Sequence, residues 1–276
     1  MNVWEALLLG VVQGLTEFLP VSSSGHLALV QRWLHWVPSQ AIAFDVVVHL
    51  GTLLAVVVAF RRELLSIARA RPRAVWPLFL ATLPLGLALP LREQVQRVQD
   101  SPLLLGLAFF VTAGVLLSAD WPFRALPAEP PREPGAEPPR EPGAEPPQEA
   151  TPRLEDVGAG RALAVGFAQL CAIMPGISRS GSTISCGLLL GLPPALAGEL
   201  SFLMSIPAVL GATVVEARHI GEQATVNPLA MLAGFLSALV SGLLAIALLR
   251  WLLSRRRLWV FVPWLLLVGL LSVATG

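Results

Sequence analysis

The chain contains no lysine and no tyrosine. All nineteen of its basic side chains are arginine, and none of its 276 residues is tyrosine. These absences exclude a phosphate-binding loop built on lysine, a Schiff-base lysine and a tyrosine nucleophile. The chain has only two cysteines, Cys171 and Cys186, so it offers no cysteine spacing typical of a metal centre.

Charge is also scarce. Charged residues make up 13% of the chain and hydrophobic residues 55%, with a formal net charge of +1 and a mean hydropathy of +0.70. A soluble domain carries about 25% charged residues. The composition therefore predicts an all-α polytopic membrane protein, and we expect a membrane environment and no nucleic-acid partner.

Six apolar segments are predicted to span the membrane, and several reach the ~17–25 residues that a spanning helix needs. They are 41–60, 76–91, 103–119, 197–217, 227–250 and 258–275. Segments 3–36 and 160–191 differ, because "LPVSSSGH" and "MPGISRSGS" break their centres. Each half is too short to cross alone, which predicts two re-entrant helix–break–helix hairpins. Irregular backbone at membrane depth is tolerated only where protein or a watery cavity satisfies it, so the breaks mark a site.

Arginine predicts the orientation. The loops at 61–75 and 250–257 are rich in arginine and are expected to be cytoplasmic, whereas those at 92–100 and 218–226 balance fewer arginines with acids and are expected outside. The first hairpin is then followed by a span that runs inward, and the second by a span that runs outward. Two similar units of opposite orientation form an inverted-topology repeat.

The chain accordingly divides into two membrane halves, 1–124 and 159–276. "GVVQGLTEFLPVSSSG" at 10–25 is echoed by "GFAQLCAIMPGISRSG" at 166–181, an offset of 156 residues. The segment between the halves, 125–158, contains "EPPREPGA" twice. Its prolines exclude a helix, so we expect a disordered or polyproline-type cytoplasmic linker.

The first break gathers polar residues into a short stretch: Glu17, Ser22, Ser23, Ser24 and His26. An ionised carboxylate near the bilayer centre costs ~2.5–3.5 kcal/mol, so a cation or proton must compensate it. Gln13 lies one helical turn before Glu17 on the same face, and the two could offer oxygens to a hard divalent cation. The structural alternative is a hydrogen bond between Glu17 and a nearby hydroxyl.

The second break supplies a cation. Arg179 presents a planar fork that matches phosphate oxygens, and the glycines let successive N–H groups turn into one concavity. A helix expected to begin near Ser182 adds its positive end. These features predict a phosphate site formed by Gly176, Ser178, Arg179, Ser180, Gly181, Ser182 and Thr183. A buried ion pair between Arg179 and Glu17 is the structural alternative.

If the two breaks meet, their side chains suffice for phosphoryl transfer. A serine hydroxyl or an activated water attacks, His26 or Glu17 handles the proton, and Arg179 with a metal stabilises the developing charge. A phosphate-bearing substrate reached from within a bilayer is most simply a lipid phosphate or diphosphate. Asp45 and His49, in the next span, either line the cavity or have a structural role.

The motifs "QGLTEFLPVSSSGH" and "PGISRSGST" resemble the two signatures of the undecaprenyl-diphosphate phosphatase family, the bacterial bacitracin-resistance proteins. The resemblance extends through "HLGTLLAVV" and "SFLMSIPAVLGA". It implies an inner-membrane enzyme that removes the terminal phosphate from C55 polyprenyl diphosphate and regenerates the carrier lipid of peptidoglycan synthesis. It also implies inverted repeats with re-entrant hairpins, a dependence on Mg²⁺ or Ca²⁺, a homodimer in many members and a site open to the periplasm.

By position, the resemblance assigns catalytic roles to Glu17, Ser23, His26 and Arg179. Glu17 would be the main metal ligand, and Gln13 stands where the family has Glu or Gln. Either Ser23 or His26 could be the nucleophile. The expected substrate contacts from the first motif are Ser22, Ser24 and Gly25.

Two other classes of membrane protein share part of this pattern. A transporter or flippase for a lipid phosphate also uses inverted repeats and broken helices, but it needs the anion site without a nucleophile. The phosphatidic-acid phosphatase superfamily has a motif similar to "SSSGH". It also requires a lysine–arginine motif and a histidine after "SR", which this chain lacks.

Overall fold

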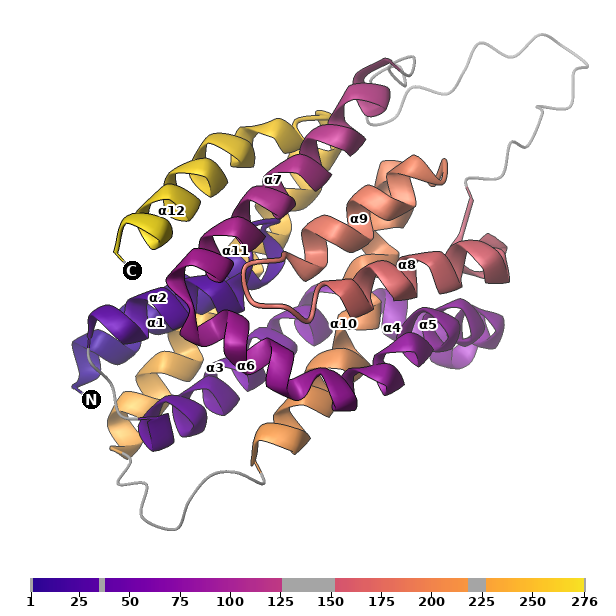
Figure 1. Ribbon diagram of the computed structural model, residues 1–276. Helices are drawn as coiled ribbons and strands as arrows, with labels where there is room; N and C mark the ends of the chain where they lie inside the picture. The colour runs from indigo at the N-terminus through magenta and orange to yellow at the C-terminus, as the bar shows by residue number, and fades with distance from the viewer. Residues whose placement is uncertain (1, 35–37, 126–151, 218–226, 276) are drawn as a thin grey trace, which may run out of the picture.

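The described part of the chain is helical throughout. The computed structural model describes residues 2–34, 38–125, 152–217 and 227–275, and these ranges contain α-helices and 3₁₀-helices but no strand. Figure 1 shows the helices packed side by side as one bundle. The all-α prediction is confirmed.

The first hairpin consists of α1 (Val3–Phe18) and α2 (Ser23–Trp33). α1 begins with a capping box, in which Asn2 accepts from the Glu5 N–H and Glu5 accepts from the Asn2 N–H. It ends just before Pro20, because a proline disfavours helical backbone in the residue that precedes it. Ser22 then turns the chain into α2 with φ of 72°, a strained conformation for a residue other than glycine.

The second hairpin consists of α8 (Ala159–Cys171) and α9 (Arg179–Leu189). Gly176, with φ of 88°, lies in the turn between them. The expectation that α9 begins near Ser182 is wrong by three residues. Ser178 accepts a hydrogen bond from the Gly181 N–H and so caps the helix at Arg179. Both predicted hairpins are present.

The remaining helices form the spans and their connections. They are α3 (Pro38–Ala59), α4 (Arg61–Arg69), η1 (Pro72–Ala74), α5 (Val75–Thr82), η2 (Leu83–Leu91), α6 (Arg92–Asp100), α7 (Pro102–Ala125), η3 (Leu154–Asp156), α10 (Pro194–Ala217), α11 (Pro228–Ser254), η4 (Leu258–Phe261) and α12 (Val262–Ala274). Among the described residues, five stretches are long and apolar enough to cross a membrane: 42–59, 72–100, 102–120, 194–215 and 228–254. They cover five of the six predicted spans. The sixth, 258–275, coincides with a shorter apolar helix over 258–274.

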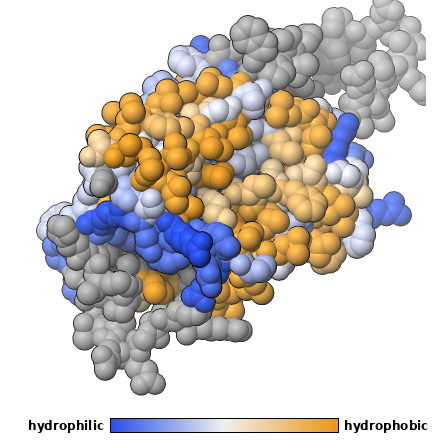
Figure 2. All heavy atoms as spheres, viewed as in Figure 1, coloured by the Kyte–Doolittle hydropathy of each residue, from blue (hydrophilic) through white to orange (hydrophobic). Residues whose placement is uncertain are grey.

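Apolar side chains cover much of the surface. In Figure 2 they form a broad area, whereas hydrophilic residues gather over α6 and the adjoining end of α2. There Arg32 donates hydrogen bonds to the carbonyl oxygens of Gln99 and Asp100. An apolar surface of this extent needs lipid around it. The chain is therefore a polytopic membrane protein.

Equivalent glycines pack the two hairpins against different spans. Gly10 of α1 lies so close to Gly234 and Ser237 of α11 that no Cβ atom fits. Gly166 of α8, 156 residues later, lies against α5, where a Cβ atom would be 2.6 Å from the Ala81 carbonyl oxygen. Figure 1 shows α1 and α2 near the end of the bundle that carries both termini, with α8 and α9 towards the other end. The hairpins enter from opposite ends, as an inverted repeat requires.

The predicted linker, 125–158, overlaps the described residues only at its ends. α7 continues to Ala125, residues 126–151 lie outside the described part, and η3 follows. Leu154 is fully buried, and Glu155 forms an ion pair with Arg71 at 3.5 Å. The end of this segment is therefore packed against the arginine-rich loop at 61–75.

Candidate active site

The two breaks meet inside the bundle. The Gly176 N–H donates to Ser22 Oγ at 3.0 Å, and Ser180 Oγ donates to the Leu19 carbonyl at 3.1 Å. A Cβ atom at Gly25 would lie 2.9 Å from the Gly176 nitrogen. Glycine at position 25 therefore allows the first hairpin to touch the second.

Glu17 lies at the centre of this meeting point. Its Oε1 accepts a hydrogen bond from Arg179 Nη2 at 2.7 Å, and its Oε2 accepts from Ser23 Oγ at 2.6 Å. Gln13 Nε2 donates to the same Oε2 at 3.0 Å. The Glu17 side chain is only 8% exposed. Both structural alternatives, the ion pair and the hydroxyl contact, are thus present, and together they hold Arg179 and Ser23 against one carboxylate.

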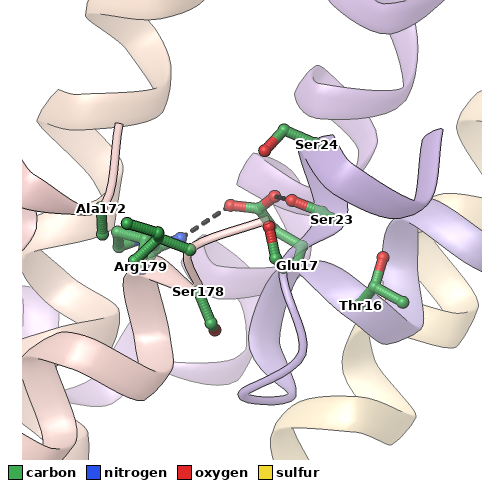
Figure 3. Close-up of a pocket in the computed structure, with 9 residues that line it drawn as sticks. Thr16, Glu17, Ser23, Ser24, Ala172, Ser178 and Arg179 are labelled. Carbon is green, nitrogen blue, oxygen red and sulfur yellow. Dashed lines mark hydrogen bonds and ion pairs between the residues drawn. The ribbon is translucent and has the colours of Figure 1, made fainter. Parts of the chain in front are cut away.

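A small pocket of about 40 Å³ opens beside these groups. Figure 3 shows its lining, with Glu17 between Arg179 on one side and Ser23 on the other. Six predicted site residues line the pocket: Glu17, Ser22, Ser23, Ser24, Ser178 and Arg179. Three lining residues were not predicted, namely Thr16, Ala172 and Ile177.

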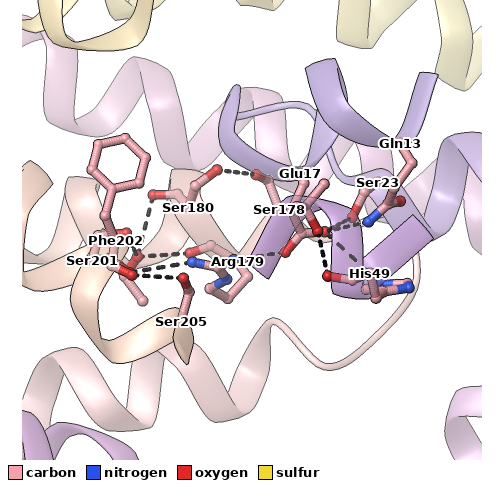
Figure 4. A network of polar contacts seen from close by, with 12 residues as sticks. Gln13, Glu17, Ser23, His49, Ser178, Arg179, Ser180, Ser201, Phe202 and Ser205 are labelled. Atoms are coloured by element: carbon pink, nitrogen blue, oxygen red, sulfur yellow. Dashed lines mark hydrogen bonds and ion pairs between the residues drawn. The ribbon is translucent and has the colours of Figure 1, made fainter. Parts of the chain in front are cut away.

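Arg179 is held from both sides. Its Nη1 donates to the Ser201 carbonyl oxygen in α10 at 3.2 Å, while Nη2 bonds Glu17. The hydroxyls of Thr183 and Ser201 lie 2.7 Å apart, and Thr183 Oγ1 also donates to the Arg179 carbonyl. Figure 4 shows this network running from α10 to the first hairpin. Ser201 is a supporting residue that the sequence analysis missed.

The predicted anion nest is only partly free. The Ser178 N–H donates to Thr112 Oγ1, the Gly181 N–H to Ser178 Oγ and the Ser182 N–H to the Ser178 carbonyl. The Gly176 N–H is used by Ser22. These amides therefore build the turn and are not bare, which corrects the expectation. Arg179 and the serine hydroxyls are left as the groups that face the pocket.

His26 does not line the pocket. Its Nδ1 lies 2.7 Å from the Ser22 carbonyl oxygen, and its Nε2 lies 2.9 Å from the indole nitrogen of Trp264. Both ring nitrogens are thus engaged, and Trp264 is a contact that the sequence analysis missed. A catalytic role for His26 stays a prediction.

The histidine that faces Glu17 is His49 of α3. Its Nε2 lies 4.0 Å from Glu17 Oε2, and its Nδ1 lies 2.6 Å from the Asp45 carbonyl oxygen. The Asp45 side chain accepts from Gln31 Nε2 at 2.6 Å. The two predicted alternatives were that these residues line the cavity or have a structural role. His49 lies next to Glu17, whereas Asp45 contacts His49 through its carbonyl oxygen.

The donors fit a divalent cation in part. Gln13 Oε1 is buried and has no hydrogen-bond partner among the described residues, so it is an acceptor in need of a donor or a metal. Glu17 is the only carboxylate that lines the pocket, and the described residues contain no group of three metal-binding side chains. Mg²⁺ commonly takes one or two carboxylates and completes its shell with water and substrate phosphates. Gln13 does not line the pocket, so Glu17 is the protein ligand that the pocket itself offers, and substrate phosphate and water would have to supply the rest of the shell.

Fold and site together define a class: polytopic α-helical membrane proteins in which two oppositely directed helical hairpins meet at a buried carboxylate, an arginine and a serine. Comparison with known families narrows this class. The model of the family described as "Bacitracin resistance protein BacA" matches residues 6–271. The chain belongs to this family.

Its relatives cover it almost from end to end. A protein of Methanobrevibacter smithii is 35% identical over 98% of this chain and 96% of the relative. One of Korarchaeum cryptofilum is 37% identical over 98% of both. One of Gemmatimonas aurantiaca is 38% identical over 100% of this chain and 98% of the relative. All three relatives are named undecaprenyl-diphosphatase.

Proposed function

We propose that the chain hydrolyses undecaprenyl diphosphate, the C55 polyprenyl diphosphate, to undecaprenyl phosphate and inorganic phosphate. This reaction recycles the carrier lipid of peptidoglycan synthesis and confers resistance to bacitracin. The observation that carries the proposal is the contact of Glu17 with both Ser23 and Arg179 at the edge of a pocket inside the helical bundle. The relatives' shared name supports the same reaction.

Ser23 is the proposed nucleophile. Its hydroxyl already donates to Glu17 Oε2 at 2.6 Å, so the carboxylate can take the proton as the oxygen attacks the terminal phosphorus. The bond from that phosphorus to the bridging oxygen breaks, and undecaprenyl phosphate leaves. Water then cleaves the phosphoserine, which releases inorganic phosphate and restores Ser23.

Arg179 is the proposed phosphate clamp. The guanidinium has planar, paired donors that match phosphate oxygens. Its contacts with Glu17 and the Ser201 carbonyl fix it at the pocket, which Ser22, Ser24 and Ser178 also line. Because these groups are placed before the substrate arrives, they stabilise transition-state charge without reorganising.

We further propose that Mg²⁺ or Ca²⁺ takes part, held by Glu17 and Gln13 Oε1. Such a cation would neutralise charge on the diphosphate oxygens. His26 is proposed to hold or deliver a proton at Nε2, the nitrogen that Trp264 contacts.

We assign the protein to the bacterial inner membrane, with the site reached from the periplasm and a homodimer as the assembly. The arginine-rich loops at 61–75 and 250–257 support this orientation.

The test is phosphate release from C55 diphosphate by the purified chain, with Mg²⁺ or with EDTA. We compare the wild type with Arg179→Lys, which keeps the charge but not the fork, and with Ser205→Ala. Ser205 is a matched control, because its buried hydroxyl donates to the Phe202 carbonyl of its own helix. We expect metal-dependent release that falls about 10²-fold in Arg179→Lys and persists in Ser205→Ala.

A lipid-phosphate transporter is the second candidate, favoured by the inverted hairpins. Ser23→Ala separates the two. A phosphatase loses phosphate release in this variant, whereas a transporter still moves lipid phosphate across vesicles. Absence of release from a folded wild type, across metals and chain lengths, would overturn the phosphatase.

A further inference from the structure

Trp264 combines two features that rarely occur together. It lies in the first turn of α12 with 49% of its surface exposed, as a lipid-facing residue does. Its indole N–H nevertheless donates to His26 Nε2 at 2.9 Å. A tryptophan that faces lipid ordinarily acts as an interfacial anchor, and that role requires no bond to a buried histidine.

The two bonds to His26 allow a single arrangement of protons on a neutral ring. The Ser22 carbonyl can only accept, so His26 Nδ1, at 2.7 Å from it, carries the hydrogen. The indole nitrogen can only donate, so His26 Nε2 carries a lone pair. The imidazole is thus the Nδ1–H tautomer, with Nε2 as its only basic nitrogen.

Neighbouring rings restrict how the imidazole can turn. The ring planes of His26 and Trp264 are nearly parallel, within 11° of each other, with centroids 5.9 Å apart. Phe109 of α7 meets the imidazole at 85° with centroids 5.2 Å apart. The phenyl ring of Phe109 has no hydrogen-bond donor, so the donor to Nε2 is the indole N–H of Trp264.

We propose that Trp264 is a positioning residue for His26. Its indole N–H keeps the imidazole in the Nδ1–H tautomer and fixes the orientation of the ring. The basic nitrogen, Nε2, therefore stays at one place where α2, α7 and α12 meet. The proton-handling role of His26 rests on the function proposed above. The tautomer and the orientation do not depend on it.

Trp264→Phe is the informative change, because it keeps an aromatic ring and removes the donor. Nε2 of His26 then has no hydrogen-bond donor beside it. The ring can adopt the Nε2–H tautomer if it gives up its hydrogen bond to the Ser22 carbonyl. We expect kcat to fall about five- to tenfold, as loss of one hydrogen bond implies. KM should stay within about twofold, because Trp264 does not line the pocket that holds Arg179.

The tautomer is measured directly by nitrogen NMR on the full chain, labelled with ¹⁵N-histidine and held in lipid nanodiscs. The chain has four histidines, and loss of one signal in His26→Gln assigns the His26 resonances. The wild type should show a single Nδ1–H form at His26. Trp264→Phe should show a mixture of tautomers or the Nε2–H form.

Trp251→Phe is the matched control. Trp251 is also 49% exposed, and its ring packs against Arg255 at 5.3 Å. It should leave the His26 signals and kcat unchanged. An Nε2–H form in the wild type, or an unchanged His26 signal in Trp264→Phe, would overturn the proposal. If the signals shift as expected while the wild type releases no phosphate, the positioning role stands and the phosphatase fails.

Discussion

The two hairpins have similar backbones but different chemistry. Between 10–25 and 166–181, at the 156-residue offset, they share five positions: Gly10 with Gly166, Gln13 with Gln169, Ser22 with Ser178, Ser24 with Ser180, and Gly25 with Gly181. They differ at the three positions expected to react. Glu17 is equivalent to Ile173, Ser23 to Arg179, and His26 to Ser182. The shared residues form the turns and the close approach. The residues that differ divide the proposed roles: the first hairpin holds the proposed nucleophile and base, and the second holds Arg179.

The paired glutamines make the difference concrete. Gln13 Nε2 donates to Glu17 at 3.0 Å, whereas Gln169 Nε2 reaches only the Ala81 carbonyl, at 3.5 Å. Both amide oxygens are buried without a hydrogen-bond partner among the described residues. Gln13 thus lies one turn before a carboxylate in α1, whereas the residue four positions after Gln169 is Ile173, just beyond the end of α8.

The largest effect should come from Glu17→Gln, which removes the carboxylate that the second hairpin lacks at its equivalent position, Ile173. Ser23 loses its proton acceptor, and Arg179 loses its partner. We expect phosphate release to fall about 10³-fold, with a destabilisation of about 3–5 kcal/mol because a buried charge is left unpaired. Phosphate assays and thermal unfolding in detergent measure the two effects.

Ile173→Leu is the control for this change, since it alters the equivalent position without changing polarity. It should lower stability by less than about 1.5 kcal/mol and leave catalysis intact. Full activity in folded Glu17→Gln would mean that the carboxylate is structural only.

A smaller effect on activity should distinguish Gln13 from Gln169 by the Mg²⁺ dependence of their variants. Gln13→Leu removes the proposed metal contact beside Glu17, and we expect the Mg²⁺ concentration for half-maximal activity to rise about tenfold. Gln169→Leu removes a buried amide oxygen that has no partner, so stability should hold or improve and the metal response should not change. Equal Mg²⁺ titrations for the two variants would argue against Gln13 as a ligand.

The smallest effect on activity should come from the packing glycines. Gly166→Ala would place a Cβ atom 2.6 Å from the Ala81 carbonyl, which should lower stability by about 1–3 kcal/mol. Gly160→Ala, in the same helix but with no atom within 4 Å of a Cβ, should raise stability by up to about 1 kcal/mol. Thermal unfolding of both variants checks this. Equal shifts would show that α8 does not pack tightly on α5.

The sequence was informative where local chemistry decides the structure. Pro20 and Gly176 mark the two breaks, and the serines and Arg179 mark their tips, so the meeting of the hairpins could be predicted. Ser201 and Trp264 could not, because a serine inside an apolar span and a tryptophan near its end have ordinary explanations. Their contacts join positions 22 and 238 residues apart. Only packing reveals them. The start of α9 was misjudged because the cap at Ser178 was not recognised.

The proline-containing segment between α5 and α6 has a consequence for length. The eight residues of α5 rise about 1.5 Å each, and the nine residues of η2 rise about 2.0 Å each. Together they cover roughly 30 Å, the thickness of the hydrocarbon core, whereas the same residues as one α-helix would cover about 25 Å. Pro84 and Pro90, which lack the N–H group of a regular helix, lie in the stretched part. The wider pitch gives this short segment about the length that a bilayer crossing needs before the polar residues of α6 begin.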